Sequence, residues 1–189
     1  MMLKVGLFGG SFNPAHEGHK MVAQCGLRDL GLDEVWWLVS PGNPLKKSTN
    51  NYEARVASVE ALGLPRDMKI SHIERDYGTR YTVDMLAKLF TRHADKQFVW
   101  MMGADNLSQM PKWKEWQVIM HSLPIAIIAR PGKGLKPRLG QVARQYSGAR
   151  IDEQFSHKIA EFEAPAWVYL TPPLNAQSST KIRAAKTQP

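Results

Sequence analysis

The chain has 189 residues, of which 43% are hydrophobic and 22% are charged, and its formal net charge is +8 at pH 7. This length and composition predict one well-packed globular domain, and they argue against disorder, a bilayer-spanning segment and, because Lys4 and Gly9-Gly10 interrupt the early apolar run, a signal peptide. The basic residues are scattered and lack interleaved aromatics, so we expect no nucleic-acid partner and no membrane partner, and the charge suits attraction of small polyphosphate ligands.

The first predicted element is a buried strand over residues 3–8, which is short and rich in branched and aromatic side chains. It leads into a helix over residues 20–30, which Gly31 ends. The connection between them reads Gly9-Gly10-Ser11-Phe12-Asn13-Pro14-Ala15-His16-Glu17-Gly18-His19. In a parallel α/β sheet such a connection lies at the carboxyl end of a strand, where ligands bind. The chain's one cysteine, Cys25, falls on the apolar face of the helix, which argues against disulfides and for a cytoplasmic protein.

The residue types in this connection favour an anion site. Gly9 and Gly10 have no Cβ atom, so their N–H groups can approach a ligand closely or adopt a positive φ. His16 and His19 are three residues apart at a helix start, so both imidazoles can lie on one side of the turn, and Gly18 keeps that helix end open. Free N–H groups and the positive end of the helix dipole then point the same way as the imidazoles.

Glycine-rich turns and histidine pairs also occur for purely structural reasons, but the complete eleven-residue pattern is far more specific. It is neither a Gly-x-Gly-x-x-Gly dinucleotide fingerprint nor a P-loop, because no Gly-Lys-Ser/Thr follows the glycines. Gly-Ser-Phe-Asn-Pro-x-His-x-Gly-His resembles the signature of the nucleotidyltransferases that transfer AMP from ATP to a phosphate or phosphorylated acceptor. Within them it is most similar to the bacterial nicotinate-mononucleotide adenylyltransferases.

Beyond residue 30 the pattern alternates between the two kinds of element. Strands are expected over residues 34–39, 68–73, 97–102, 125–129 and 167–170, and helices over residues 52–62, 83–92 and 139–146. This alternation predicts an α/β protein with a doubly wound, mostly parallel sheet. The resemblance implies a Rossmann-like nucleotidyltransferase fold in a single domain over residues 1–189, with the C-terminal motif completing the ATP site. Residues 133–165 carry mixed signals and predict no function.

The segment over residues 40–50 is a polar loop by composition and carries adjacent lysines. It is either a solvated surface loop or an arm whose lysine reaches a phosphate. The family often has Pro-Pro-His-Lys here, whereas this chain has Asn43-Pro44-Leu45-Lys46 and so lacks the histidine. The resemblance implies a catalytic role for Lys46, with Lys47 as the alternative.

Two aromatic stretches concern the acceptor. Thr82 suits a helix N-cap, and in the family a similar Tyr-Thr stretch holds the nicotinate carboxylate, which the resemblance transfers to Tyr81 and Thr82. Trp113 and Trp116 could both belong to the core, but a pyridine ring needs an aromatic wall. In the family the Trp of a Lys-Trp motif lines that pocket, so Trp113 is expected at the ligand and Trp116 in packing. We also expect Asn13 to contact the mononucleotide.

Gly103-Ala104-Asp105 follows a buried strand, so the carboxylate could accept hydrogen bonds from ribose hydroxyls or could cap the next helix. The resemblance favours the ribose contact, because Gly-Ala-Asp recurs in the family. Together with the first connection, this assigns ATP binding to glycines, hydroxyls and neighbouring groups at Gly9, Gly10, Ser11, Phe12, Gly18, Gly103, Asp105, Ser178, Ser179 and Thr180.

The last of these belong to a C-terminal segment, Gln177-Ser178-Ser179-Thr180-Lys181-Ile182-Arg183, which resembles the family's Ile-Ser-Ser-Thr-x-Ile-Arg with Gln177 in place of the first Ile. Three hydroxyls before a short helix offer N-cap chemistry and donors for phosphate oxygens. Arg183, one turn later, can add a charge-assisted hydrogen bond. A disordered polar tail is the alternative.

The resemblance implies that ATP and nicotinate mononucleotide give nicotinate adenine dinucleotide and pyrophosphate. An acceptor phosphate is already anionic, so positioning and charge neutralisation suffice, with His16, His19, Lys46 and Arg183 as the catalytic groups. Mg²⁺ is expected on the ATP phosphates rather than on a protein metal site. Nicotinamide mononucleotide or another phosphorylated acceptor, a non-catalytic nucleotide sensor, and tRNA or DNA binding stay open as alternatives. The oligomeric state also stays open, with a homo-oligomer among the options.

Overall fold

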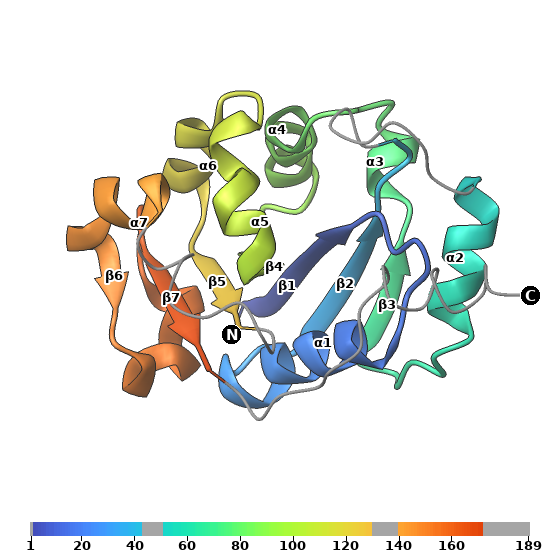
Figure 1. Cartoon of the computed structure of the whole chain (residues 1–189), viewed down its shortest axis with the longest axis horizontal. Helices are drawn as coiled ribbons and strands as arrows, with labels where there is room; N and C mark the ends of the chain where they lie inside the picture. The colour runs from blue at the N-terminus through green and yellow to red at the C-terminus, as the bar shows by residue number, and fades with distance from the viewer. Residues whose placement is uncertain (1, 43–50, 130–139, 172–189) are drawn as a thin grey trace, which may run out of the picture.

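A seven-stranded parallel sheet forms the centre of the computed structural model, which describes residues 2–42, 51–129 and 140–171 (Figure 1). Every strand pairing recorded in this part of the chain is parallel. The strand order is β3-β2-β1-β4-β5-β7-β6. The strands are β1 (Leu3–Gly10), β2 (Glu34–Val39), β3 (Met68–Ser71), β4 (Lys96–Gly103), β5 (Ile125–Ile128), β6 (Arg150–Ile151) and β7 (Trp167–Leu170).

The chain winds outward from β1 in both directions, which confirms the predicted doubly wound α/β architecture. It first builds β2 and β3 on one side of β1 and then returns to place β4 on the other side. The strand order therefore reverses between β1 and β4. In open α/β sheets the crevice outside the carboxyl ends of the strands at such a reversal is where ligands bind.

Helices cover both faces of the sheet, and α4, α5 and α6 lie together along one side of it while α1 lies along the other (Figure 1). They are α1 (Glu17–Asp29), α2 (Tyr52–Glu60), α3 (Ile73–Asp76), α4 (Thr82–Arg92), α5 (Ala104–Gln109), α6 (Trp116–Ser122) and α7 (Gln141–Gln145), with 3₁₀ segments η1 (Met110–Lys112), η3 (Ser147–Ala149) and η4 (Glu153–Glu161). No helix in the described part of the chain combines the length and the apolar character needed to cross a membrane.

Alternation along the buried strands produces two hydrophobic clusters, one on each face. In β4, Trp100 and Met102 join the cluster that α4, α5 and α6 cover, whereas Val99 and Met101 join the cluster that α1 covers. Because successive side chains of a strand point to opposite faces, a strand that is buried on both faces reads as a continuous apolar run. This explains why these strands could be predicted from the sequence.

The element bounds agree with prediction in the centre and differ at the edges. The strands over residues 34–39 and 167–170 have the predicted limits, whereas β1 continues to Gly10 and takes in the glycine pair. The strand predicted over residues 68–73 is shorter in the structure, since β3 ends at Ser71 and α3 begins at Ile73. Helix α4 begins at Thr82 with Tyr81 as its N-cap, so the prediction of Thr82 as the N-cap was wrong.

Candidate active site

The glycines at the ends of β1 and β4 bring the main sequence motifs to one edge of the sheet. Strand β1 pairs with β4 from Leu3 to Phe8 and ends at Gly10, while β4 ends at Gly103. Asp105 follows in the first turn of α5 and is partly buried. These residues, predicted to bind ATP, therefore lie at the carboxyl edge where the strand order reverses.

The turn over residues 11–16 is built around the buried ring of Phe12. This residue has φ +44°, in the left-handed region, which for a side chain with a Cβ atom costs about 1 kcal/mol. Its ring packs at 5.3 Å from Phe8, 5.0 Å from Trp37 and 5.2 Å from His19 between ring centroids, and this burial offsets the backbone cost. Any contact between Phe12 and a nucleotide would therefore come from its backbone. The Asn13-Pro14 peptide bond within the turn is cis.

His16 and His19 lie against each other at the start of α1. His16 is the N-cap residue and His19 belongs to the first turn, and they are 3% and 8% exposed. Their ring centroids are 3.8 Å apart, and the His16 backbone N–H donates a hydrogen bond to Nδ1 of His19 at 3.3 Å. Because Nδ1 is the acceptor, a neutral His19 carries its proton on Nε2, which is then a donor. The structure thus brings the two histidines together as predicted.

Gly9 and Gly10 lie in β1 and neither has a positive φ, which excludes one of the two uses expected for them. A Cβ atom on Gly9 would lie 2.7 Å from Cη2 of Trp100, and one on Gly10 would lie 2.9 Å from Cζ of Phe12. Both distances are shorter than real carbon contacts, so these glycines make room for aromatic rings of the same chain. Sequence reasoning missed Trp100, because only the folded sheet brings its ring to Gly9.

The aromatic groups assigned to the acceptor lie on the other face of the sheet from the histidine pair. Trp113 is partly buried and meets Trp100 edge to face, with centroids 6.1 Å apart and an angle of 84°. Tyr81 is 42% exposed at the start of α4, and the Lys114 ammonium lies 5.1 Å from the centroid of its ring. Because Lys114 directly follows Trp113 in the chain, its contact with Tyr81 brings the segment that carries Trp113 to the start of α4. Trp116 is buried and packs on Tyr146, the packing role expected for it.

Helix α2 supports the turn from outside, which the sequence analysis did not anticipate. Arg55 is 2% exposed and donates hydrogen bonds to the carbonyls of Ser11 at 2.9 Å and Pro41 at 3.4 Å. The available signal was a charged residue one helical turn before Val59, on the buried face of α2. Burial lowers the pKa of Arg55 from its ordinary value.

Glu74 in α3 lies close enough to Arg55 for their charges to interact. Burial raises the pKa of Glu74 to about 7, and the Arg55 charge and a hydrogen bond from the Ser40 hydroxyl oppose that rise without cancelling it. Ser40 is itself fixed, because its N–H donates to the carbonyl of Gly10 at 3.0 Å. The ends of β1, β2 and β3 are therefore connected by one polar network.

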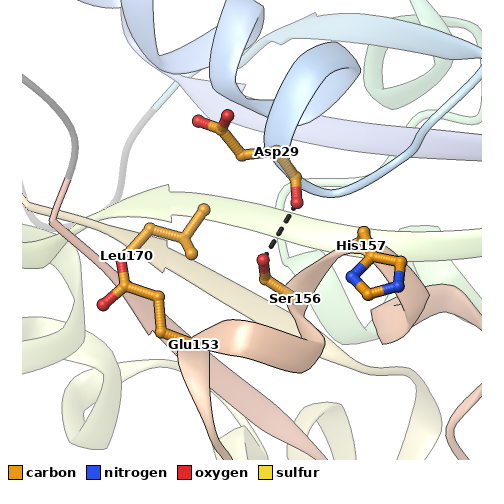
Figure 2. Close-up of a pocket in the computed structure, with 5 residues that line it drawn as sticks. All are labelled: Asp29, Glu153, Ser156, His157 and Leu170. Atoms are coloured by element: carbon orange, nitrogen blue, oxygen red, sulfur yellow. Dashed lines mark hydrogen bonds between the residues drawn. The ribbon is translucent and has the colours of Figure 1, made fainter.

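A separate hollow of about 300 Å³ lies at the other end of α1 (Figure 2). Its lining residues are Asp29, Glu153, Ser156, His157 and Leu170, and the Ser156 hydroxyl donates to the carbonyl of Asp29 at 3.0 Å. No residue predicted for the active site lines it. Its contacts join η4 to the end of α1.

Six predicted residues lie outside the described part of the chain: Lys46, Lys47, Ser178, Ser179, Thr180 and Arg183. Their roles stay predictions. Within residues 2–42, 51–129 and 140–171 no group of three or more His, Cys, Asp or Glu side chains could hold a metal ion. The polar groups in the described turn are imidazoles and helix N–H groups, which suit phosphate oxygens, whereas Mg²⁺ prefers oxygen ligands.

The chain is similar to known proteins both in sequence and in fold. The family model described as cytidylyltransferase-like matches residues 7–185. A protein of Parvibaculum lavamentivorans named "Probable nicotinate-nucleotide adenylyltransferase" is 48% identical over 183 residues, covering 96% of this chain and 91% of the relative. A protein of the same name from a Caulobacter species is 46% identical over 188 residues, covering 98% of this chain and 100% of the relative. The Plasmodium falciparum nicotinic acid mononucleotide adenylyltransferase complexed with NaAD shares the fold, with a TM-score of 0.69, 18% identity and coverage of 96% of this chain and 83% of that one.

Proposed function

This chain belongs to the cytidylyltransferase-like family, and we infer from its relatives that it is a nicotinate-nucleotide adenylyltransferase. It transfers AMP from ATP to nicotinate mononucleotide, giving nicotinate adenine dinucleotide and pyrophosphate, a step of NAD biosynthesis. The observation that carries this conclusion is the likeness to curated relatives of that name at 43–48% identity over nearly the full length. A phosphate oxygen of the mononucleotide attacks the α-phosphorus of ATP, and the bond from that phosphorus to the bridging β-phosphate oxygen breaks.

The chemistry requires donors for phosphate oxygens rather than a general base. The attacking oxygen is already anionic, so the protein has to align the two phosphates and neutralise the charge that develops on the α-phosphate and the pyrophosphate. In our proposal His16 and His19 supply those donors together with the N-terminus of α1. The support is that Nδ1 of His19 is occupied by the His16 N–H, which leaves Nε2–H as its donor.

The acceptor is proposed to lie on the other side of this edge, against Trp113. The ring of Trp113 stands edge to face on Trp100, and Trp100 fills the space beside Gly9. An aromatic wall therefore begins next to the end of β1. Tyr81 and Thr82 at the start of α4 would meet the nicotinate carboxylate, and the N-terminus of that helix favours a negative charge. Asn13 is proposed to contact the mononucleotide from the turn.

Some of the residues proposed to bind ATP lie in the described part of the chain and others lie outside it. Asp105 at the start of α5 would accept hydrogen bonds from the ribose hydroxyls, at the edge where Gly103 ends β4. Lys46 and the C-terminal Ser179, Thr180 and Arg183 would bind the triphosphate, and this assignment comes from the sequence motifs alone.

Mg²⁺ is proposed to arrive on the ATP phosphates. Its preference for oxygen ligands and retained waters makes binding through phosphate oxygens natural, and it would neutralise charge there. We further propose ATP and nicotinate mononucleotide as the physiological substrates and the cytoplasm as the compartment.

A pyrophosphate-release assay tests the proposal. The purified full chain is incubated with Mg·ATP and, separately, nicotinate mononucleotide, nicotinamide mononucleotide and 4′-phosphopantetheine. We expect release with nicotinate mononucleotide to have the highest kcat/KM. A higher value with the nicotinamide compound would reassign the acceptor, and release with none of the three would overturn the function.

A further inference from the structure

Arg55 is a fully buried cation close to the proposed active site but facing away from solvent. It lies in α2, and only 2% of its surface is exposed. It is one of the largest fully buried side chains in the described part of the chain. A buried charge is destabilising unless its hydrogen bonds are made. The question is therefore where the guanidinium directs its donors.

Those donors join two loops that leave neighbouring strands. Nη1 of Arg55 donates to the carbonyl of Ser11 at 2.9 Å, across 44 residues of sequence, and Nη2 to that of Pro41 at 3.4 Å. Ser11 is the first residue after β1 and opens the turn that ends at His16. Pro41 follows β2 and lies in the first residues of the predicted loop over residues 40–50, whose lysines are candidates for a phosphate contact. A planar guanidinium can hold two carbonyls at fixed separation, which a lysine ammonium cannot do as well.

A second group on α2 holds the same turn at its other end. The Ser58 hydroxyl accepts a hydrogen bond from the Ala15 N–H at 2.9 Å, and it donates to the Arg55 carbonyl at 2.7 Å with the Phe12 carbonyl 3.3 Å away. Ser58 is three residues after Arg55, so both side chains lie on one face of α2. Figure 1 shows α2 beside the segment that leaves β1. The turn is therefore fixed on both sides of Phe12, whose ring packs on His19.

We propose that Arg55 is a positioning residue for adenylyl transfer, which holds the turn over residues 11–16 so that His16 and His19 meet the phosphates in register with the segment after β2. This role rests on the proposed function, and it assigns Arg55 no contact with substrate. A shift of about 1 Å in such groups costs on the order of 100-fold in rate. We therefore expect the main effect in kcat. The KM for nicotinate mononucleotide should change less, because Asn13 is its one proposed contact in this turn and the pyridine ring binds on the other face.

The kinetic test uses Arg55→Lys and Arg55→Met. We expect kcat to fall about 10-fold for Arg55→Lys and up to about 100-fold for Arg55→Met, with the KM for nicotinate mononucleotide changed less than about 3-fold. Arg75→Met is the matched control. The guanidinium carbons of Arg55 and Arg75 lie 5.6 Å and 5.0 Å from the ring centroid of Tyr52, but Arg75 is exposed and pairs with Glu53. Arg75→Met should keep wild-type kcat. Wild-type kcat in both Arg55 variants would overturn the inference.

A double-mutant cycle separates positioning from a general loss of structure. If Arg55 acts through both histidines, then Arg55→Lys should lower kcat less than about 2-fold in a His16→Ala/His19→Ala background. A loss of about 10-fold in that background would overturn the positioning role. Thermal unfolding of each variant identifies any that is unfolded at the assay temperature, and the lysine variant carries the test if the methionine variant is.

Amide hydrogen exchange provides a readout that needs no activity, so a failure of the proposed function stays distinguishable. In Arg55→Lys we expect exchange at residues 11–16 to accelerate at least about 10-fold while α1 beyond its first turn keeps its protection. Unchanged protection of the turn overturns the positioning role. Wild-type protein that releases no pyrophosphate overturns only the reaction.

Discussion

The backbone N–H of His16 donates to Nδ1 of His19 at 3.3 Å, and the two rings lie 3.8 Å apart between centroids. One histidine therefore sets the tautomer and orientation of the other. The aromatic contact of His19 with Phe12 fixes the ring from a second side. This arrangement gives the proposed donor its direction before any substrate binds, which is the condition for efficient electrostatic stabilisation of a transition state.

Replacements of His19 should distinguish the roles of its two ring nitrogens, Nδ1 and Nε2. We expect His19→Ala to lower kcat by roughly 100-fold, the scale for losing one preorganised donor. His19→Gln can place an amide N–H near the Nε2 position, whereas His19→Asn can replace only Nδ1. The glutamine variant should therefore retain more kcat than the asparagine variant in the pyrophosphate-release assay. Equal activities would show that Nε2 is not the donor, and near-normal turnover of the alanine variant would remove His19 from the mechanism.

Trp113 should affect acceptor binding and little else. Loss of an aromatic wall removes about 1 kcal/mol of stacking, so Trp113→Leu is expected to raise the KM for nicotinate mononucleotide about 5- to 10-fold with the KM for ATP unchanged. Trp116→Phe is the matched control, because Trp116 is buried and packs on Tyr146. It should lower stability and leave both KM values near wild type. A rise in both KM values for Trp113→Leu would contradict the assignment.

Glu74 should make stability depend on pH. Burial raises its pKa from 4.5 to about 7, so between these values the folded state binds more protons than the unfolded state. The free energy of unfolding then falls as pH rises through this window, by an amount on the order of 3 kcal/mol for the full shift. Glu74→Gln cannot ionise and keeps an oxygen for the Ser40 hydroxyl.

Urea unfolding of Glu74→Gln and wild type from pH 4 to pH 8 measures this effect. The variant should gain stability relative to wild type as pH rises from about 4.5 to about 7 and hold that gain above. Glu60→Gln removes the same charge from an exposed position of α2 and serves as the control. Parallel curves for Glu74→Gln and wild type would show that the Glu74 carboxyl is not perturbed.

The central strands and the histidine pair could be predicted from the sequence, because both signals are local. Residues 35–39 are apolar on both faces, and His16 and His19 are three residues apart, so no distant information is needed. The tethers by Arg55 and Ser58 could not be predicted, since their partners lie 44 and 43 residues away. The segment over residues 153–161 escaped prediction for another reason: it forms a 3₁₀ helix, whose period differs from the α-helical pattern.

The contact between Gly9 and Trp100 predicts an energetic coupling between them. A Cβ atom on Gly9 would lie 2.7 Å from Cη2 and 2.8 Å from Cζ2 of Trp100, which is buried and cannot move aside freely. Gly9→Ala should therefore lower the free energy of unfolding by about 1–3 kcal/mol, the range for overpacking a core. Gly148→Ala, where an added Cβ meets nothing within 4 Å, should change it little.

Trp100→Phe removes the part of the indole that occupies the space beside Gly9. The substitution alone leaves a cavity and is destabilising. In that background the alanine methyl group of Gly9→Ala enters vacated space, so its penalty should shrink toward zero or change sign. Urea unfolding of wild type, the two single variants and the double variant gives the coupling energy. We expect it to be about 1 kcal/mol or more, close to the overpacking penalty of Gly9→Ala alone. If the two penalties simply add, then the ring of Trp100 is not what requires glycine at position 9, and the aromatic wall proposed for the acceptor loses its connection to the end of β1.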